Sequence, residues 1–230
     1  MKKGFPFIFV CLMFIFFFTV QVQTSAQVKK AYDEYTIYID PGHGGYDGGA
    51  KRNNDLIEKE LNLSVALYLR NYLEQVGINV LLTRNKDMDF VSPGKGSKKK
   101  RDLDKRIEMI NNSNCDFFVS IHMNALRNPR WHGAQTFYFD NFAENKLLAE
   151  KIQQTLVEVL QNTHRKAKTV NTLYLFKKVK KPGALIEVGF LSNPYEANLL
   201  KQRQYQDKVA FGIYLGIIHF LNKEDILMEY

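Results

Sequence analysis

Two histidines and two glutamates in this chain have the types and settings that metal-assisted hydrolysis requires. His43 lies in the glycine-rich segment 41–45, Glu58 follows it at the start of a periodic segment, His122 follows an apolar run, and Glu187 stands inside another. Two imidazoles and one carboxylate can hold Zn²⁺ at three positions and leave a fourth for water, as in catalytic zinc sites. The remaining carboxylate can then act as a base towards that water, whose pKa the metal lowers to about 7.

Each of these residues also has an ordinary structural interpretation. A histidine in a glycine-rich loop can be a turn residue, and one beside an apolar strand can be hydrogen-bonded at the edge of the core. Glu58 can be a carboxylate that the helix dipole favours at a helix N-terminus. Glu187 is harder to explain in this way, because a carboxylate among apolar residues is seldom buried without a partner. Spacing alone therefore leaves a metal site and a set of unrelated structural residues both open.

The elements that must position these residues follow from hydrophobic periodicity. Short apolar runs predict strands at 37–40, 78–83, 116–121, 134–139, 173–176 and 184–188. Helical spacing predicts helices at 58–76, 106–112, 143–161 and 205–221. Strands that alternate with helices indicate an α/β fold, with a mostly parallel sheet in a single domain and no internal repeat. The carboxyl ends of parallel strands share one edge of a sheet, so all four candidate residues are expected to converge there.

Residues 1–26 have the composition of a targeting segment. Two lysines precede an uncharged apolar run from Phe5 to Val20, and small residues occupy positions 24–26. This pattern predicts a signal peptide. An uncleaved N-terminal membrane anchor stays open, although the run is slightly shorter than the roughly 17–25 residues of a spanning helix. In both cases residues 27–230 form the working domain, which is expected outside the cytoplasm, either secreted or membrane-anchored.

The composition is that of a globular protein with excess positive charge. The chain has 230 residues, of which 45% are hydrophobic and 24% are charged, and this excludes a disordered tail, a coiled coil or a collagen-like repeat. Its formal net charge is +8, and +6 remains without residues 1–26. That excess suits an anionic cell envelope or membrane surface. Nucleic acid is not an expected partner, because the exported chain lacks a recognised binding motif.

Several other kinds of site are excluded or left without support. Without residues 1–26, Cys115 is the only cysteine, so an internal disulfide cannot form and a metal site must use histidines and carboxylates. The glycine-rich segment 42–47 lacks the third glycine of a dinucleotide loop, and neither an HExxH helix nor a GxSxG elbow occurs. The polar segment 85–101, which ends in three lysines and an arginine, predicts a solvated loop or an electrostatic guide for an acidic glycan or membrane.

Four segments, in this order and at these intervals, resemble those of the zinc-dependent N-acetylmuramoyl-L-alanine amidases, which are bacterial cell-wall hydrolases. They are Asp40-Pro41-Gly42-His43-Gly44-Gly45, Glu58-Lys59-Glu60-Leu61-Asn62-Leu63, Ser120-Ile121-His122-Met123-Asn124-Ala125 and Glu187-Val188-Gly189-Phe190-Leu191-Ser192-Asn193. The resemblance extends from about Thr36 to Phe220. It implies a six-stranded, mostly parallel sheet with helices on both faces, of the phosphorylase/hydrolase-like kind.

The resemblance also assigns the site. It implies that His43, Glu58 and His122 hold one zinc ion per chain and that Glu187 is the catalytic glutamate. The motif of the family places its ligand immediately before a lysine, which favours Glu58 over Glu60.

Two arginines complete what the resemblance assigns. Arg84 and Arg106 match positions that the family favours, and they are expected to be scaffold residues or substrate contacts.

The activity that the resemblance implies is hydrolysis of the amide between N-acetylmuramic acid and L-alanine in peptidoglycan. Glu187 would take a proton from the attacking water and return it to the alanine amine. Segments 130–138 and 165–168 are further similar to the germination-specific amidases of endospore formers, which act in spore cortex as the first step of muramic δ-lactam formation. That similarity adds the space between the two spore membranes to the expected locations.

Three alternatives to an autonomous amidase stay open. One is another zinc peptidoglycan hydrolase, a stem-peptide endopeptidase or carboxypeptidase. The second is a non-catalytic wall-binding domain. The third is an enzyme that depends on an activating protein partner, for which segment 85–100 would be a docking surface.

Overall fold

The computed structural model describes residues 32–52 and 56–227, with side chains up to Asn222. The predicted targeting segment, residues 1–26, lies outside the described residues. In the described part of the chain, no helix is both long enough and apolar enough to cross a membrane.

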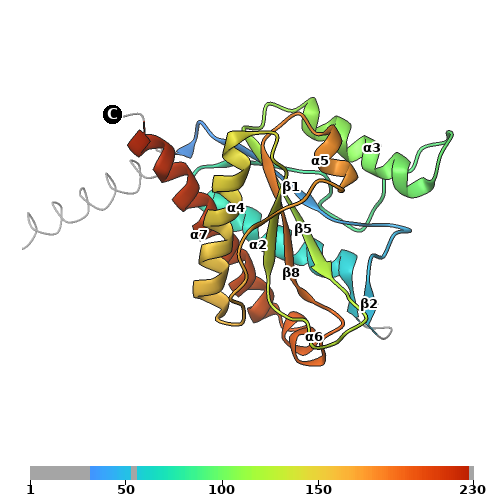
Figure 1. Cartoon of the computed structure of the whole chain (residues 1–230). Helices are drawn as coiled ribbons and strands as arrows, with labels where there is room; N and C mark the ends of the chain where they lie inside the picture. The colour runs from blue at the N-terminus through green and yellow to red at the C-terminus, as the bar shows by residue number, and fades with distance from the viewer. Residues whose placement is uncertain (1–31, 53–55, 228–230) are drawn as a thin grey trace, which may run out of the picture.

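A six-stranded sheet forms the middle layer of the molecule (Figure 1). In spatial order its strands are β4 (Asn79–Leu82), β1 (Thr36–Pro41), β5 (Phe117–Asn124), β8 (Gly183–Phe190), β6 (Gln135–Tyr138) and β7 (Lys168–Thr169). The first four strands are parallel, β6 is antiparallel to β8, and β7 is parallel to β6. The mostly parallel α/β sheet and its six strands are therefore confirmed. A separate antiparallel pair joins β2 (Lys51–Arg52) to β3 (Leu56–Ile57).

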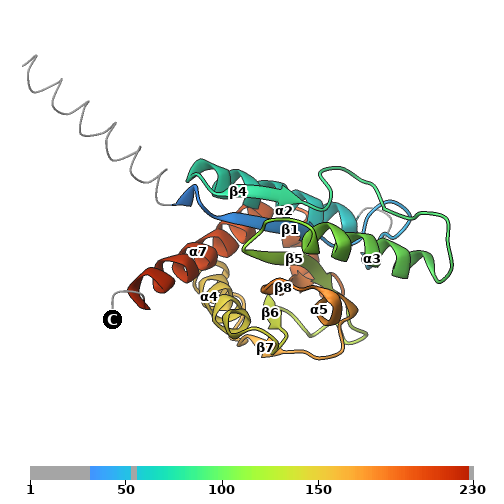
Figure 2. The same cartoon turned by 90° about the horizontal axis from the view of Figure 1, so that it is seen from above.

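Helices cover both faces of the sheet, as expected. Helices α2 (Glu58–Gln75), α4 (Ala143–Leu160) and α7 (Arg203–Leu227) pack on one another and against one face. Helices α3 (Lys98–Asn111) and α5 (Tyr174–Lys178) cover the other, and α6 (Pro194–Leu200) follows β8. Figure 2 shows α4 and α7 together on one side of the strands and α3 and α5 on the opposite side.

The side chains of the central strands alternate between two cores of unequal size. Ile37, Ile39 and Val119 belong to the larger core under α2, α4 and α7, whereas Tyr38 and Phe118 belong to the smaller core under α3 and α5. Successive side chains of a strand point to opposite faces. The same alternation brings the side chains of residues 40, 120, 122 and 187 to the face that α3 and α5 cover. The chemistry therefore lies on the less thickly covered face.

Three predictions of local structure are wrong, namely those for segment 173–176, for His122 and for the basic end of segment 85–101. The apolar run 173–176 predicts a strand, but Leu173 is the N-cap of α5 and the other three residues lie in that helix, which packs Phe176 against Phe118 with ring centroids 5.9 Å apart. An apolar run this short does not distinguish a strand from a helical turn. His122 is expected just after a strand, but it lies inside β5.

The basic end of segment 85–101 is helical and not a loop. Helix α3 begins at Lys98, and the Oγ of Ser97 accepts a hydrogen bond from the amide of Lys100 at 3.2 Å. A serine at this position satisfies one of the free amides of the first turn, so the lysines continue into a helix. The sequence also did not reveal α6, which Asn193 caps through the amide of Glu196, or the short strand β7.

Candidate metal centre and active site

The loop after β1 carries His43 in an uncommon backbone conformation. His43 has a φ of 62°, in the left-handed region that non-glycine residues rarely adopt. Just before it, the amide of Gly42 donates to the carbonyl of Ile121 at 2.9 Å, which ties the loop to β5. A Cβ on Gly42 would lie 2.2 Å from the His122 ring, so only glycine lets the two histidines approach in this way.

Two buried arginines hold the carbonyl groups of this loop. Arg84 donates to the carbonyls of Pro41 at 3.0 Å and Gly42 at 2.9 Å. Arg106 donates to those of Pro41 at 2.9 Å and His43 at 2.5 Å. Of the two roles expected for these arginines, their burial and hydrogen bonds favour scaffolding.

The charge of Arg106 is balanced by two aspartates. Its guanidinium pairs with Asp40 at 2.8 Å and with Asp102 at 2.7 Å. Burial raises the pKa of Asp40, but the nearby Arg106 outweighs it and holds that pKa below its ordinary value. Hydrogen bonds from Thr83 and Ser120 stabilise the same carboxylate. The base of the site is thus a buried network of ion pairs and hydrogen bonds.

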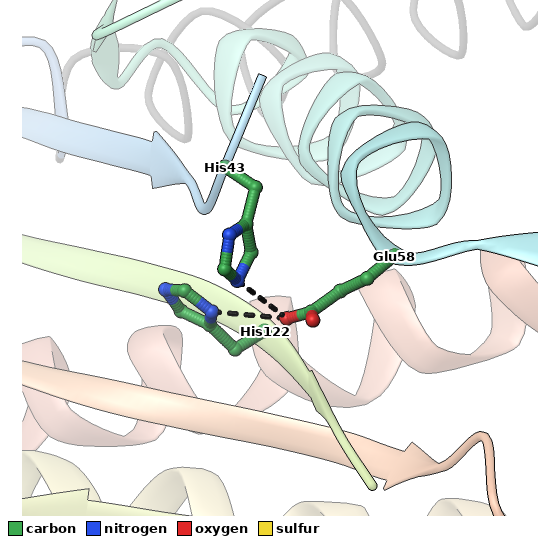
Figure 3. A group of neighbouring side chains, drawn as sticks. All are labelled: His43, Glu58 and His122. Atoms are coloured by element: carbon green, nitrogen blue, oxygen red, sulfur yellow. Dashed lines mark hydrogen bonds and ion pairs between the residues drawn. The ribbon is translucent and has the colours of Figure 1, made fainter. Parts of the chain in front are cut away.

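His43, Glu58 and His122 converge at the edge of the sheet, as the sequence predicted. One potential ligand atom from each lies within 4.8 Å of the other two. Oε1 of Glu58 lies 3.2 Å from Nε2 of His43 and 3.1 Å from Nδ1 of His122, and Figure 3 shows both imidazoles directed at this one oxygen. Glu60, the alternative to Glu58, is exposed and lies outside the group.

The carboxylate of Glu58 is fixed by backbone amides as well as by the histidines. Its Oε2 accepts a hydrogen bond from Ala50 at 2.7 Å, and its Oε1 accepts one from Met123 at 3.0 Å. Glu58 is the first residue of α2, which brings it to the edge where β1 and β5 end. The donor set is therefore held in place, with two ring nitrogens and one carboxylate close enough together to share a cation.

A fourth residue, Asp47, orients His43 and was not among the predicted site residues. Its Oδ2 lies 2.9 Å from Nδ1 of His43, and its Oδ1 accepts the amide of Gly49 at 3.0 Å. A carboxylate on one ring nitrogen sets the tautomer and leaves the other nitrogen, here Nε2, available to a metal. The acidic residue four positions after His43 was the available signal, but a loop sequence does not show where that carboxylate points.

The protonation equilibria of the group match a cation site. Burial raises the pKa of Glu58, but hydrogen bonds and charge interactions with His122 and His43 outweigh it and hold the pKa far below its ordinary value. Burial lowers the pKa of His43, but Glu58 and Asp47 outweigh it and raise the pKa. The protein thus favours a positive charge between these side chains, which a proton or a zinc ion can supply.

Glu187 lies beside the three and differs from them in having an unsatisfied oxygen. In the β5–β8 ladder it is paired in register with His122, so both side chains point to the same face. Its Oε2 is buried and has no hydrogen-bond partner among the described residues. Burial is the main reason that the pKa of Glu187 rises to about 7. A carboxylate with this pKa can accept and release a proton near neutral pH.

His43, His122, Glu187 and Asp47 line one cavity of about 260 Å³. His43, His122 and Glu187 line one side, and residues of α3 and of the N-terminal end of α5 line the other. Three of the four predicted site residues therefore line a space that a small part of a polymer can enter, and the fourth, Glu58, contacts two of them. His132, His164 and His219 are not part of the cluster that could hold a metal.

Comparison with known proteins agrees with this geometry. A family model described as N-acetylmuramoyl-L-alanine amidase matches residues 37–219. The chain belongs to this amidase family. The match covers all the strands of the sheet except the first residue of β1, and it includes His43, Glu58, His122 and Glu187.

Two curated members of the family are similar to this chain over most of its length. The germination-specific N-acetylmuramoyl-L-alanine amidase of Bacillus subtilis is 49% identical over 191 residues, which cover 82% of this chain and 80% of that protein. The amidase LytC of the same organism is 34% identical, but the matched region covers 87% of this chain and only 38% of LytC.

Solved structures of the family share the fold. The CwlD amidase of Clostridioides difficile, solved in complex with the GerS lipoprotein, has a TM-score of 0.79 and 40% identity, covering 82% of this chain and 99% of that one. The catalytic domain of CwlV from Bacillus (Paenibacillus) polymyxa has a TM-score of 0.71 and 29% identity, covering 82% and 98%.

Proposed function

We propose that this amidase is zinc-dependent and hydrolyses the bond between N-acetylmuramic acid and the L-alanine of the stem peptide in spore-cortex peptidoglycan. The observation that carries the proposal is the convergence of His43, Glu58 and His122 beside the unpartnered oxygen of Glu187. Two imidazoles and a carboxylate are a donor set that zinc accepts. The similarity to the germination-specific amidase of Bacillus subtilis supports the cortex as the substrate.

The residues of this chain divide the chemistry between binding and proton transfer. His43, Glu58 and His122 would hold a zinc ion, which would supply Lewis-acid polarisation of the amide carbonyl and lower the pKa of the attacking water. Glu187 takes one proton from the water as the oxygen attacks the carbonyl carbon, and it returns that proton to the nitrogen as the carbon–nitrogen bond breaks. The products are the muramic carboxyl group and a peptide with a free alanine amino terminus.

The rigid surroundings of the cluster serve this reaction by positioning. Arg106 and Arg84 hold the His43 loop, and Asp47 sets the orientation of the His43 ring. Burial around Glu187 keeps competing water from its free oxygen and raises its pKa into the range of an acid–base catalyst. Preorganised groups of this kind need little rearrangement when the substrate arrives.

The proposal includes a location and a partner. We place the enzyme outside the cytoplasm, in the cell envelope or between the two membranes of the developing spore, because residues 1–26 have the pattern of a signal peptide or membrane anchor. A protein partner is supported by the CwlD amidase, whose structure is a complex with the GerS lipoprotein.

The test compares the full chain, purified in mild detergent with zinc, with its Glu187→Gln variant on purified cortex peptidoglycan. Mass spectrometry of the soluble products should reveal peptides with free L-alanine amino termini and peptide-free muramic acid, only with the wild-type chain. Cleavage within the peptide, which leaves alanine on muramic acid, would instead identify an endopeptidase or carboxypeptidase. Spores of a strain that lacks this chain should contain no muramic δ-lactam, and its persistence would contradict the cortex assignment.

A further inference from the structure

The wall of the cavity opposite the metal ligands has a charge that the mechanism does not use. Three consecutive lysines begin α3, and their ammonium groups have different surroundings. Lys98 lies over the ring of Tyr46 at 5.7 Å, and Lys100 donates to Asp104 at 2.6 Å. Of the three, Lys99 is the one that lines the cavity in the described part of the chain.

Lys99 retains hydrogen-bonding capacity towards the cavity. Its side chain is 64% exposed, and its Nζ forms a long ion pair with Oδ2 of Asp47 at 4.0 Å, beyond ordinary hydrogen-bond distance. Both oxygens of Asp47 already have partners, His43 and the amide of Gly49. The aspartate is therefore a weak competitor for the ammonium group, which can turn towards a ligand.

The other charged groups of the cavity wall are already matched. Arg106 is 1% exposed and pairs with Asp40 and Asp102, so its charge is paired inside the protein and does not face a ligand. Apart from the candidate zinc ligands and Glu187, two charged lining groups among the described residues have accessible surface, namely Lys99 and the already hydrogen-bonded Asp47. The cavity thus offers an apolar lining, with leucines at 103, 173, 175 and 185, and one accessible cation.

We propose that Lys99 binds a free carboxylate of the stem peptide next to the scissile amide, an inference that rests on the proposed amidase function. On the glycan side the substrate is uncharged near the reacting bond, because the lactyl carboxyl group is itself part of the amide. The nearest anion is on the peptide side, where a glutamate linked through its γ-carboxyl group exposes its α-carboxylate. Lys99 therefore distinguishes a stem peptide with glutamate at its second residue from one with the uncharged isoglutamine.

An ammonium–carboxylate hydrogen bond is charge-assisted and is stronger than one between neutral groups. The pair is also exposed on one side, so salt should weaken it. We expect a preference for the glutamate peptide of about tenfold in kcat/KM, in the range that one charge-assisted hydrogen bond supplies.

The experiment uses the full chain with zinc and two soluble disaccharide–tripeptide fragments that differ only in D-glutamate or D-isoglutamine at the second peptide residue. Lys99→Met should lower kcat/KM about tenfold for the glutamate fragment and leave the isoglutamine fragment within about twofold. Lys98→Met is the matched control, because it removes the same charge from the same helical turn without changing the cavity lining; it should retain the wild-type preference. Lys99→Arg should restore part of the preference.

Three outcomes would overturn the inference while leaving the amidase function intact. They are an equal rate of the wild-type chain on both fragments, an equal loss on both in Lys99→Met, and the same loss of preference in Lys98→Met. Failure of the proposed function differs, because neither fragment would be cleaved at the alanine amide by any variant. Affinities of the Glu187→Gln chain for the two fragments, measured by calorimetry, provide the same comparison without turnover, and equal affinities would also count against the role of Lys99.

Discussion

Two glutamates near the carboxyl end of β8, the half-buried Glu187 of the strand and the buried Glu196 of the following helix α6, have surroundings that are opposite in character. Glu196, on α6, accepts hydrogen bonds from the amides of Gly133 at 3.0 Å and Phe190 at 2.7 Å and from the side chain of Asn162 at 3.3 Å. Glu187 has a buried oxygen with no hydrogen-bond partner among the described residues. Both lie in the same strand–helix unit, yet one carboxylate joins three segments and the other is available to a ligand.

The comparison shows how burial acts on a carboxylate according to its hydrogen bonds. Burial raises the pKa of both groups, but in Glu196 the backbone amides of Phe190 and Gly133 oppose the increase. In Glu187 the main opposing influence is the charge of His122, and the pKa reaches about 7. A carboxylate whose hydrogen-bonding capacity is filled by the protein stabilises the fold. A carboxylate that lacks such partners gains free energy when it binds a proton or accepts a hydrogen bond from a substrate.

The largest expected effect separates the two glutamates by activity. Glu187→Gln should lower kcat roughly 10²–10⁴-fold, because proton transfer by a positioned group contributes about that factor. Its bound zinc should equal that of the wild-type chain, since the three ligands remain. Glu196→Gln should retain activity within about threefold once folded. Product release followed by mass spectrometry, with metal content by atomic spectrometry, tests both; an active Glu187→Gln variant would remove Glu187 from the mechanism.

The next effect separates them by stability. Glu196→Ala should lower the free energy of unfolding by on the order of 3 kcal/mol, because the buried amides of Gly133 and Phe190 lose their acceptor. Urea unfolding followed by circular dichroism measures the change. Glu187→Gln is the matched control and should not destabilise the protein. Equal stability of Glu196→Ala and the wild-type chain would mean that this carboxylate does not hold the segments together.

A third effect concerns the pH dependence of stability without metal. The pKa of Glu187 is about 7 in the folded chain against an ordinary 4.5, so the folded state holds the proton more tightly. The stability that protonation of Glu187 contributes is complete below pH 4.5 and is lost as the pH rises through 7. Relative to Glu187→Gln, the wild-type chain should therefore lose about 2 kcal/mol of unfolding free energy between pH 5 and pH 8. Chelator-treated samples unfolded in urea at both pH values provide the measurement, and parallel pH profiles would show that Glu187 is not desolvated.

The smallest effect tests one donor of the Glu196 cluster. The side-chain amide of Asn162 bonds both Glu196 at 3.3 Å and the hydroxyl of Tyr205 at 2.8 Å. Asn162→Ala should lower the free energy of unfolding by about 1 kcal/mol, which is typical of a net side-chain hydrogen bond. The amide donors of Gly133 and Phe190 remain, so the loss should stay below that of Glu196→Ala. A loss as large as in Glu196→Ala would mean that the side-chain amide of Asn162, and not the backbone amides of Gly133 and Phe190, supplies most of the stability of the cluster.

Much of the site could be predicted because its residues carry local signals. Glycines flank His43, His122 follows an apolar run, and Glu187 is an acid within one, so each has an unusual local setting. The family motif, in which the ligand stands immediately before a lysine, favours Glu58 over Glu60. Asp47, Lys99 and Glu196 lack such signals, because an acid in a polar loop, a lysine among lysines and an acid early in a helix are common at exposed positions.

The fold was predictable to a similar depth and for a similar reason. Long amphipathic segments and buried strands were found at close to their observed bounds, because hydrophobic periodicity is a local property of the chain. The errors fall on short or polar segments. These are the run 173–176, most of which lies in α5, and the start of α3 at Lys98. In these segments packing against Phe118 and capping by Ser97 decide the conformation, and neither is visible in composition.

The sequence by itself determined the α/β class, the candidate ligands and the expectation that they meet where parallel strands end. Tertiary structure alone decided which oxygen is free: the β5–β8 register sets Glu187 beside His122, and the turn before α6 brings amides to Glu196. The physical reason is that residue type and periodicity are local, whereas hydrogen-bond saturation depends on backbone groups that come from distant segments. The hydrogen-bond partners of a carboxylate, and not its residue type, therefore decide whether it stabilises the fold or takes part in chemistry.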